Sequence, residues 1–141
     1  MDITFWKDEA KKQIQPELFS TFAEKLAQTI HSEGERGKNK RTQLRKFYDE
    51  VVRFDGMLKG LKQEEVNDEF QRILPYLKML NAKAAYAMGR GLISSGFRDF
   101  IASSLSRINN RDDFQVFAGL FEAFMGFYRL YDDDKIEGGR A

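Results

Sequence analysis

The sequence predicts an all-α protein, folded as a single compact bundle of about five helices. Apolar residues recur at intervals of three and four along most of the 141 residues, which is the period of an amphipathic helix. Only two prolines occur, and β-branched residues are sparse. The 13 phenylalanines require a buried core, and a chain of this length can enclose one without a disulfide or a metal.

The first helix is expected to begin near Pro16, because proline suits the first turn of a helix. Its apolar face consists of Leu18, Phe19, Phe22, Leu26 and Ile30. Residues 1–15 precede it as an N-terminal segment whose order the pattern leaves open. Phe5 and Trp6 of that segment either pack back on the bundle or dock into a neighbouring subunit.

A glycine-flanked loop over residues 35–41 leads into the second helix, for which Thr42 is the expected N-cap. The apolar stripe of this helix comprises Leu44, Phe47, Val51, Phe54, Leu58 and Leu61. A third helical region spans about residues 63–92, and Pro75 predicts a kink or break in it near Leu74. Its inner face comprises Val66, Phe70, Ile73, Leu77, Leu80, Ala84 and Met88.

A fourth helix is expected over about residues 97–108, and a fifth is capped by Asp112 or Asp113. The aromatic stripe of the fifth helix comprises Phe114, Phe117, Phe121, Phe124 and Tyr128. The helical bundle therefore spans residues 16–131. Residues 132–141 are polar and contain glycine, so they are expected to form a disordered tail.

Charge is sorted along the chain, although the formal net charge is only +1. Residues 34–61 contain eight Lys/Arg and four Asp/Glu, which is a local balance of +4. Residues 1–33 and 111–141 both carry an excess of acidic side chains. A phosphate backbone responds to a local patch rather than to the net charge, so the basic middle is a candidate for nucleic-acid binding.

No pattern in the chain builds a convincing catalytic or metal site. Cysteine is absent, which removes thiolate ligands and thiol nucleophiles, and the single histidine, His31, has no partner for a catalytic pair. The carboxylates of residues 132–134 diverge by about 100° per residue on a helix, so they do not converge on one ion. A solvated first turn accounts better than a cation site for Glu64, Glu65, Asp68 and Glu69. The sequence therefore predicts a protein that is not an enzyme and needs no cofactor or metal.

No signal peptide or membrane span is expected, because the first residues are charged and lack a long apolar run. Absence of cysteine fits a reducing compartment. Together these features favour a cytoplasmic protein that has no membrane partner.

The basic segment has two interpretations. The cations that fall largely off the apolar stripe of the second helix are Arg41, Arg45, Lys46 and Arg53. Lys83 and Arg90 lie seven residues apart and so share one face of the third region. Short polar donors that could reach phosphate oxygens are interleaved at Asn39, Thr42 and Gln43. A solvated helix surface explains the same pattern, and the residues alone leave the two interpretations about even.

Three segments carry a family resemblance, and they are KNKRTQLRKFYDEV (residues 38–51), LPYLKMLNAKAAYAMGR (74–90) and FEAFMGFYRLY (121–131). The first contains Gln-Leu-Arg-Lys-Phe, the second ends on Ala-Tyr-Ala-Met-Gly-Arg, and the third is an aromatic helix. In this order and spacing they resemble the small α-helical subunit of the type III-A CRISPR–Cas effector, the Csm complex, which is its second subunit family.

The resemblance implies a compact all-α domain without catalytic activity, which acts in antiviral defence as part of a ribonucleoprotein filament. It implies contact with the crRNA–target RNA duplex or with single-stranded target RNA, mainly through the target strand. It also implies contact with other Csm subunits, and either a homo-oligomer or copies stacked along the filament. By position, the RNA-facing candidates are Lys40, Arg41, Arg45, Lys83 and Arg90. Second choices are Lys38, Lys46, Arg53 and Lys78.

Two other hypotheses remain open beside this one. A helical adaptor or self-assembling module would present the same basic face to an acidic protein and would not bind RNA directly. A nuclease would need Glu64 or Asp68 to hold a metal ion, and it is disfavoured because the carboxylates do not converge.

Overall fold

The computed structural model describes the backbone of residues 1–140 and the side chains of residues 1–132. It confirms the all-α class and the single compact domain. The α-helices are α1 (Ala23–Ser32), α2 (Arg41–Leu58), α3 (Gln63–Lys78), α4 (Leu80–Gly89), α5 (Ser95–Ser106) and α6 (Arg111–Arg140). A π-helical turn, η1 (Leu18–Phe22), runs into α1, and a 3-10 turn, η2 (Glu35–Gly37), follows it. The disordered tail expected over residues 132–141 falls almost wholly outside the described side chains and stays a prediction.

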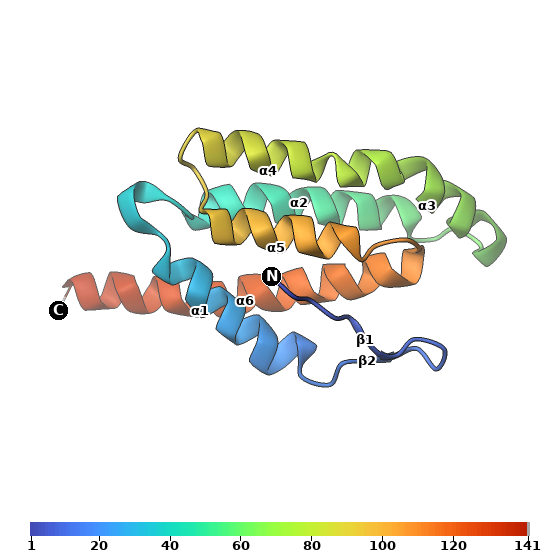
Figure 1. Cartoon of the computed structure of the whole chain (residues 1–141), viewed down its shortest axis with the longest axis horizontal. Helices are drawn as coiled ribbons and strands as arrows, with labels where there is room; N and C mark the ends of the chain where they lie inside the picture. Colours follow the sequence, from blue (N-terminus) through green and yellow to red (C-terminus); the bar gives the residue numbers. More distant parts are fainter. Residues whose placement is uncertain (141) are drawn as a thin grey trace.

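The longer helices lie roughly along one axis of the molecule, with α6 along one side of the bundle and α1 crossing it (Figure 1). It packs against α1, α2, α3 and η1, while α5 packs against α4. The loop before α2 and the loop between α4 and α5 lie at the same end of the bundle (Figure 1). The loop between α2 and α3 and the start of α6 lie at the other end.

An aromatic cluster forms the centre of the core. The stripe expected for the last helix is confirmed, because all five of its aromatic side chains are at most 1% exposed. Phe97 and Phe100 of α5 meet it, and the centroid of the Phe100 ring lies 5.3 Å from that of Phe121. Aromatic contacts of this kind add to the burial of apolar surface, so the first half of α5 is held against α6.

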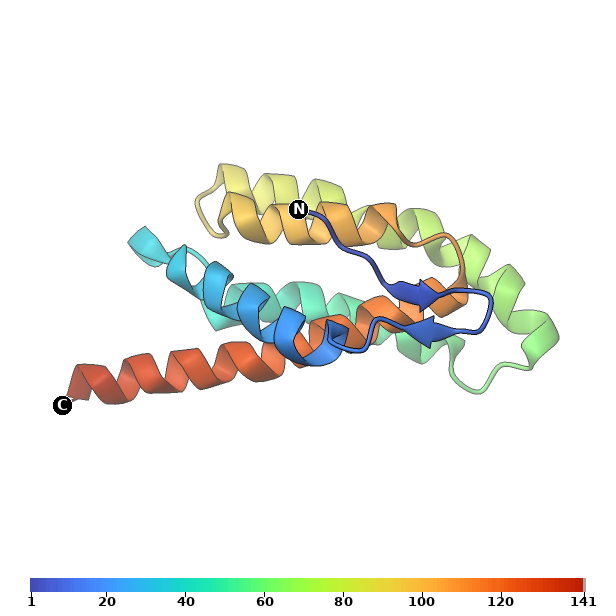
Figure 2. The ribbon, with the colours of Figure 1, turned by 60° about the horizontal axis from the view of Figure 1, so that its bottom comes forward.

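The segment before the bundle is an ordered hairpin that the sequence did not reveal. Strands β1 (Trp6–Asp8) and β2 (Gln13–Ile14) pair antiparallel, with Trp6 opposite Ile14. The hairpin lies across the start of α6 (Figure 2). Phe5 is 3% exposed, and Trp6 Nε1 donates to Asp113 Oδ1 at 2.7 Å. Both aromatic residues therefore pack back on the bundle of their own chain.

Two expected helix starts are corrected. The first residue of α6 is preceded by Asn110, whose Oδ1 accepts the amide of Asp113 at 2.8 Å, so Asn110 is the cap and Asp113 belongs to the first turn. The buried carboxylate of Asp113 instead accepts two hydrogen bonds from outside the helix. Its Oδ1 accepts from Trp6 Nε1, and its Oδ2 accepts from the amide of Asn109 at 3.0 Å. Thr42 lies inside α2, and Lys40 occupies the N-cap position without a side-chain hydrogen bond.

The third helical region and the first apolar face also differ from expectation. Pro75 stays inside α3, and the break lies at Met79, where the amide bonds to the carbonyls of both Pro75 and Tyr76. Proline removes one N–H and crowds the carbonyl four residues before it, but the residues after it can keep their helical bonds, and α3 continues to Lys78. Phe19 is 39% exposed rather than buried, because its ring lies on the outer surface of α6 over Gly119.

Candidate nucleic-acid interface

The basic loop, residues 38–41, is anchored by the side chain of Asn39. This side chain is 2% exposed, and its Nδ2 donates to the carbonyl of Ile30 at 3.0 Å and to Ser94 Oγ at 2.8 Å. Its Oδ1 accepts the amide of Ser94 at 2.8 Å. One amide side chain thus joins the end of α1 to the start of α5, and every polar atom in it has a partner.

The backbone of Asn39 makes two further long-range bonds. Its amide donates to the carbonyl of Leu92 at 3.0 Å, and the buried hydroxyl of Tyr128 donates to its carbonyl. Burial raises the pKa of Tyr128 well above its ordinary value, and the charge of Asp132 adds to the effect, so this hydroxyl remains a donor. Asn39 has a φ of 59°, a left-handed conformation that asparagine adopts more readily than most residues.

Asn39 is therefore a structural residue and is not available to RNA, which corrects its assignment as a phosphate donor. What it does is position its neighbours. Lys38 and Arg41 are half-buried and Lys40 is exposed, and all three line a cavity of about 260 Å³ together with His31 and other residues. The amides in the first turn of α2 add partial positive charge at the same place.

The same network brings Arg90 to the basic loop, although the two are some 50 residues apart in the sequence. Arg90 follows the last residue of α4 and lies two residues before Leu92, which bonds to Asn39. Arg45 and Lys46 lie one turn further along α2 and are exposed. We call this group of six cations the basic end, and it consists of Lys38, Lys40, Arg41, Arg45, Lys46 and Arg90.

Arg53 and Lys83 form a separate pair around one carboxylate. Glu50 Oε2 lies 2.8 Å from Arg53 Nη2, and Glu50 Oε1 lies 3.4 Å from Lys83 Nζ, so this contact links α2 to α4. Partial burial raises the pKa of Glu50, but the hydrogen bond from Arg53 and the charge of Lys83 outweigh it, and the pKa of this carboxyl is lowered overall. Glu50 thus offsets one of the two positive charges of this pair, and a net charge of +1 remains there.

The remaining predicted residues differ in how freely they could meet a phosphate. Arg45 Nε lies 3.8 Å from Asp49 Oδ1, a loose exposed pair of little energetic value. Lys78 is the half-buried last residue of α3, and among the described residues its side chain has no ion pair or hydrogen bond. The structure therefore brings six of the nine candidates together, pairs two elsewhere, and leaves Lys78 apart.

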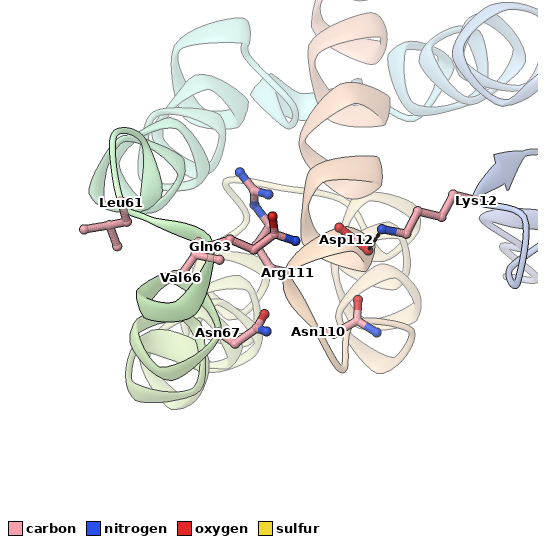
Figure 3. Close-up of a pocket in the computed structure, with 8 residues that line it drawn as sticks. All are labelled: Lys12, Leu61, Gln63, Val66, Asn67, Asn110, Arg111 and Asp112. Carbon is pink, nitrogen blue, oxygen red and sulfur yellow. Dashed lines mark ion pairs between the residues drawn. The ribbon is translucent and has the colours of Figure 1, made fainter.

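A larger polar cavity of about 530 Å³ lies at the other end of the bundle (Figure 3). Amide side chains of Gln63, Asn67 and Asn110 surround it, and at its edge Lys12 Nζ pairs with Asp112 Oδ2 at 3.4 Å. None of the nine predicted residues lines this cavity. Since α2 is 18 residues long, roughly 27 Å separate it from the basic end.

A search of the described residues for metal sites found no group of three His, Cys, Asp or Glu side chains able to hold an ion. His31 Nε2 lies 3.3 Å from Asp132 Oδ1, at the end of α1 as expected. Over the same described residues, no helix is long and apolar enough to cross a membrane.

The fold and this surface define a small all-α protein with a concentrated basic end. A family model described as Csm2 Type III-A matches residues 13–134. Because the match spans most of the chain, the protein belongs to the Csm2 family of type III-A CRISPR systems. Members of this family are small structural subunits that associate with the other subunits of the Csm complex in antiviral defence. Searches of curated proteins and of solved structures found no match.

Replacing Asn39 by alanine is expected to lower the free energy of unfolding by about 3 kcal/mol. The change leaves the buried Ser94 amide unpaired and removes one of the two hydrogen bonds to the Ile30 carbonyl, which still accepts the amide of Glu33. It also puts a Cβ without a compensating bond in a left-handed conformation. Asn39→Gly should lose about 1 kcal/mol less, because glycine accepts this φ. Urea denaturation measures both, with the exposed Asn81→Ala on α4 as control. Equal stability of Asn39→Ala and Asn81→Ala would contradict the anchoring role.

Replacing Glu50 by glutamine is expected to lower stability by about 0.5 kcal/mol at pH 7, since it removes two partly exposed ion pairs. The pKa of Glu50 is lower in the folded state than its ordinary value of 4.5, so its contribution is present above that pH and is lost as the pH falls through the folded pKa. Thermal unfolding from pH 7 to pH 3 should show the variant and the parent converging. The stabilising role of Glu50 would be refuted if the stability difference between Glu50→Gln and the parent persisted at pH 3. It would also be refuted if the exposed Glu122→Gln lowered stability at pH 7 by the same amount.

Proposed function

We propose that this chain is the non-enzymatic RNA-binding small subunit of a cytoplasmic type III-A Csm complex. Its basic end contacts the backbone of the crRNA–target RNA duplex, mainly the target strand, and other surfaces contact neighbouring subunits. The observation that carries the proposal is the cluster of cations at the loop that Asn39 anchors, where Lys38, Lys40 and Arg41 line one cavity. Arg45 and Lys46 follow on α2, and Arg90 lies two residues before Leu92, which bonds to Asn39.

The chemistry of the basic end suits phosphate rather than base recognition. Its side chains are lysines and arginines of one loop, of the first two turns of α2 and of the end of α4, beside the positively polarised start of α2. In a guide complex the sequence is read by base pairing, so a protein subunit needs to recognise only backbone charge and shape. A few phosphate contacts per copy give weak binding, which repetition along a filament strengthens.

The competing function, an adaptor that meets an acidic protein, draws support from the ion pairs of Arg45, Arg53 and Lys83 within the chain. These pairs show that the cations already bind carboxylates within the chain, which is the chemistry that an acidic protein would offer. Both functions require the exposed Lys40 and Lys46, so the two functions are distinguished by whether these lysines bind RNA or protein.

Alanine at Lys40, Arg45 and Lys46 together is expected to weaken binding of an RNA duplex by about 500-fold at ~0.1 M salt. Each lost phosphate contact on a duplex removes about 0.9 from the slope of log affinity against log salt, so three remove about 2.7 decades between 0.1 and 1 M. Fluorescence anisotropy across a salt series measures both quantities. All three side chains are exposed, so the variant should keep its helical circular dichroism.

The matched control replaces Lys11, Lys59 and Lys62, which are also exposed, lower the net charge equally and lie toward the other end of the bundle. It should retain at least a third of the parental affinity. If the parent protein binds no RNA at any salt but co-purifies with Csm subunits through the same three cations, the adaptor function is correct instead.

A further inference from the structure

The two most exposed large aromatic side chains of the described chain lie on α3 and α4. Tyr76 is 62% exposed and Tyr86 is 66% exposed, whereas nearly all phenylalanines are buried in the core. Met79 lies between them and is 49% exposed. Exposed aromatic rings grouped on one face of a protein commonly mark a binding surface.

These residues form a single stripe. Tyr76, Met79, Lys83, Tyr86 and Arg90 follow one another at intervals of three and four, so they share one side of the nearly continuous α3–α4 rod. The opposite side of the rod carries the buried residues Ile73, Leu77, Leu80 and Ala84. We call the exposed set the tyrosine stripe.

The charge along this rod is of one sign. From Phe70 to Arg98 the sequence contains five Lys/Arg and no Asp or Glu. Glu50 reaches the stripe from α2 and pairs with Lys83. The guanidinium of Arg90 lies 5.8 Å from the centroid of the Tyr86 ring, and its Nη1 donates to the Tyr86 hydroxyl at 3.2 Å. A surface of aromatic rings alternating with cations complements a chain of aromatic bases alternating with phosphates.

We propose that the tyrosine stripe binds single-stranded RNA by stacking bases on the rings of Tyr76 and Tyr86. Stacking needs bases whose faces are open, which single strands supply and a duplex does not. The inference rests on the proposed function, which makes RNA the ligand. It adds a second RNA-binding surface, and one that prefers a single strand to a duplex. The stripe is continuous with the basic end, since Arg90 belongs to both and the following loop is hydrogen-bonded to Asn39.

The two surfaces differ in how their affinity responds to salt. Loss of a phosphate contact makes the slope of log affinity against log salt shallower, whereas loss of a stacked base lowers the affinity at every salt and leaves the slope unchanged. The probes are a single-stranded oligouridylate and an RNA duplex with the same number of phosphates. Tyr76→Ala and Tyr86→Ala remove the rings, and Tyr76→Phe and Tyr86→Phe retain them.

Each alanine variant is expected to bind oligouridylate about 5-fold to 100-fold more weakly with an unchanged salt slope, while its affinity for the duplex stays within twofold. The phenylalanine variants should bind as the parent does. Val52→Ala and Met57→Ala, which alter exposed apolar side chains of α2, are the matched controls and should have no effect.

Parental affinity of both alanine variants for oligouridylate would overturn the stripe proposal and leave the proposed function standing, provided that duplex binding still depends on Lys40, Arg45 and Lys46. Failure of the parent protein to bind the duplex would instead refute the proposed function. If the alanine variants keep their RNA affinity and lose only association with other Csm subunits, the stripe is a protein interface and the proposal is wrong.

Discussion

A single buried side chain, that of Asn39, determines how the ends of four segments meet. Its amide joins the last turn of α1 to the first residue before α5, and its peptide group joins Leu92 and Tyr128. These partners lie far apart in the sequence, so the local pattern of helices cannot by itself place them. Because an unpaired buried amide or carbonyl is costly, the network accepts little variation in geometry. The position of the basic loop relative to the end of α4 follows from it.

This constraint explains how a chain with a net charge of only +1 can present a concentrated basic surface. The aromatic core of α5 and α6 holds the helices, and the anchored loop then brings its own lysines together with cations of α2 and of the end of α4. Glu50 offsets one of the two charges of Arg53 and Lys83 halfway along α2, so the positive charge is highest toward the loop. The large polar cavity lies at the other end and shares none of these residues (Figure 3).

The sequence predicted most of the helices because their apolar period is local, and the stripes of α2 and α6 are buried almost as expected. It did not predict the β1–β2 hairpin, which is held on the bundle by the hydrogen bond from Trp6 to Asp113, more than 100 residues away. The break at Met79 was displaced from the position that proline indicated, because a helix tolerates one missing N–H. Six of the nine candidate residues lie together, but the structural role of Asn39 depends on residues 55 and 89 positions distant. An asparagine two residues after Gly37 was the one local signal, since asparagine adopts a left-handed conformation more readily than most residues.

Amide hydrogen–deuterium exchange with and without an RNA duplex tests the central claim most directly, since it maps the contact without changing any residue. The account predicts slower exchange over residues 38–46 and 86–92, because the first amides of α2 have no partner within the helix and RNA would cover them. Exchange over residues 61–67 and 110–113, around the distant polar cavity, should stay the same. Protection confined to that cavity, or none at an RNA concentration that saturates binding, would contradict the account.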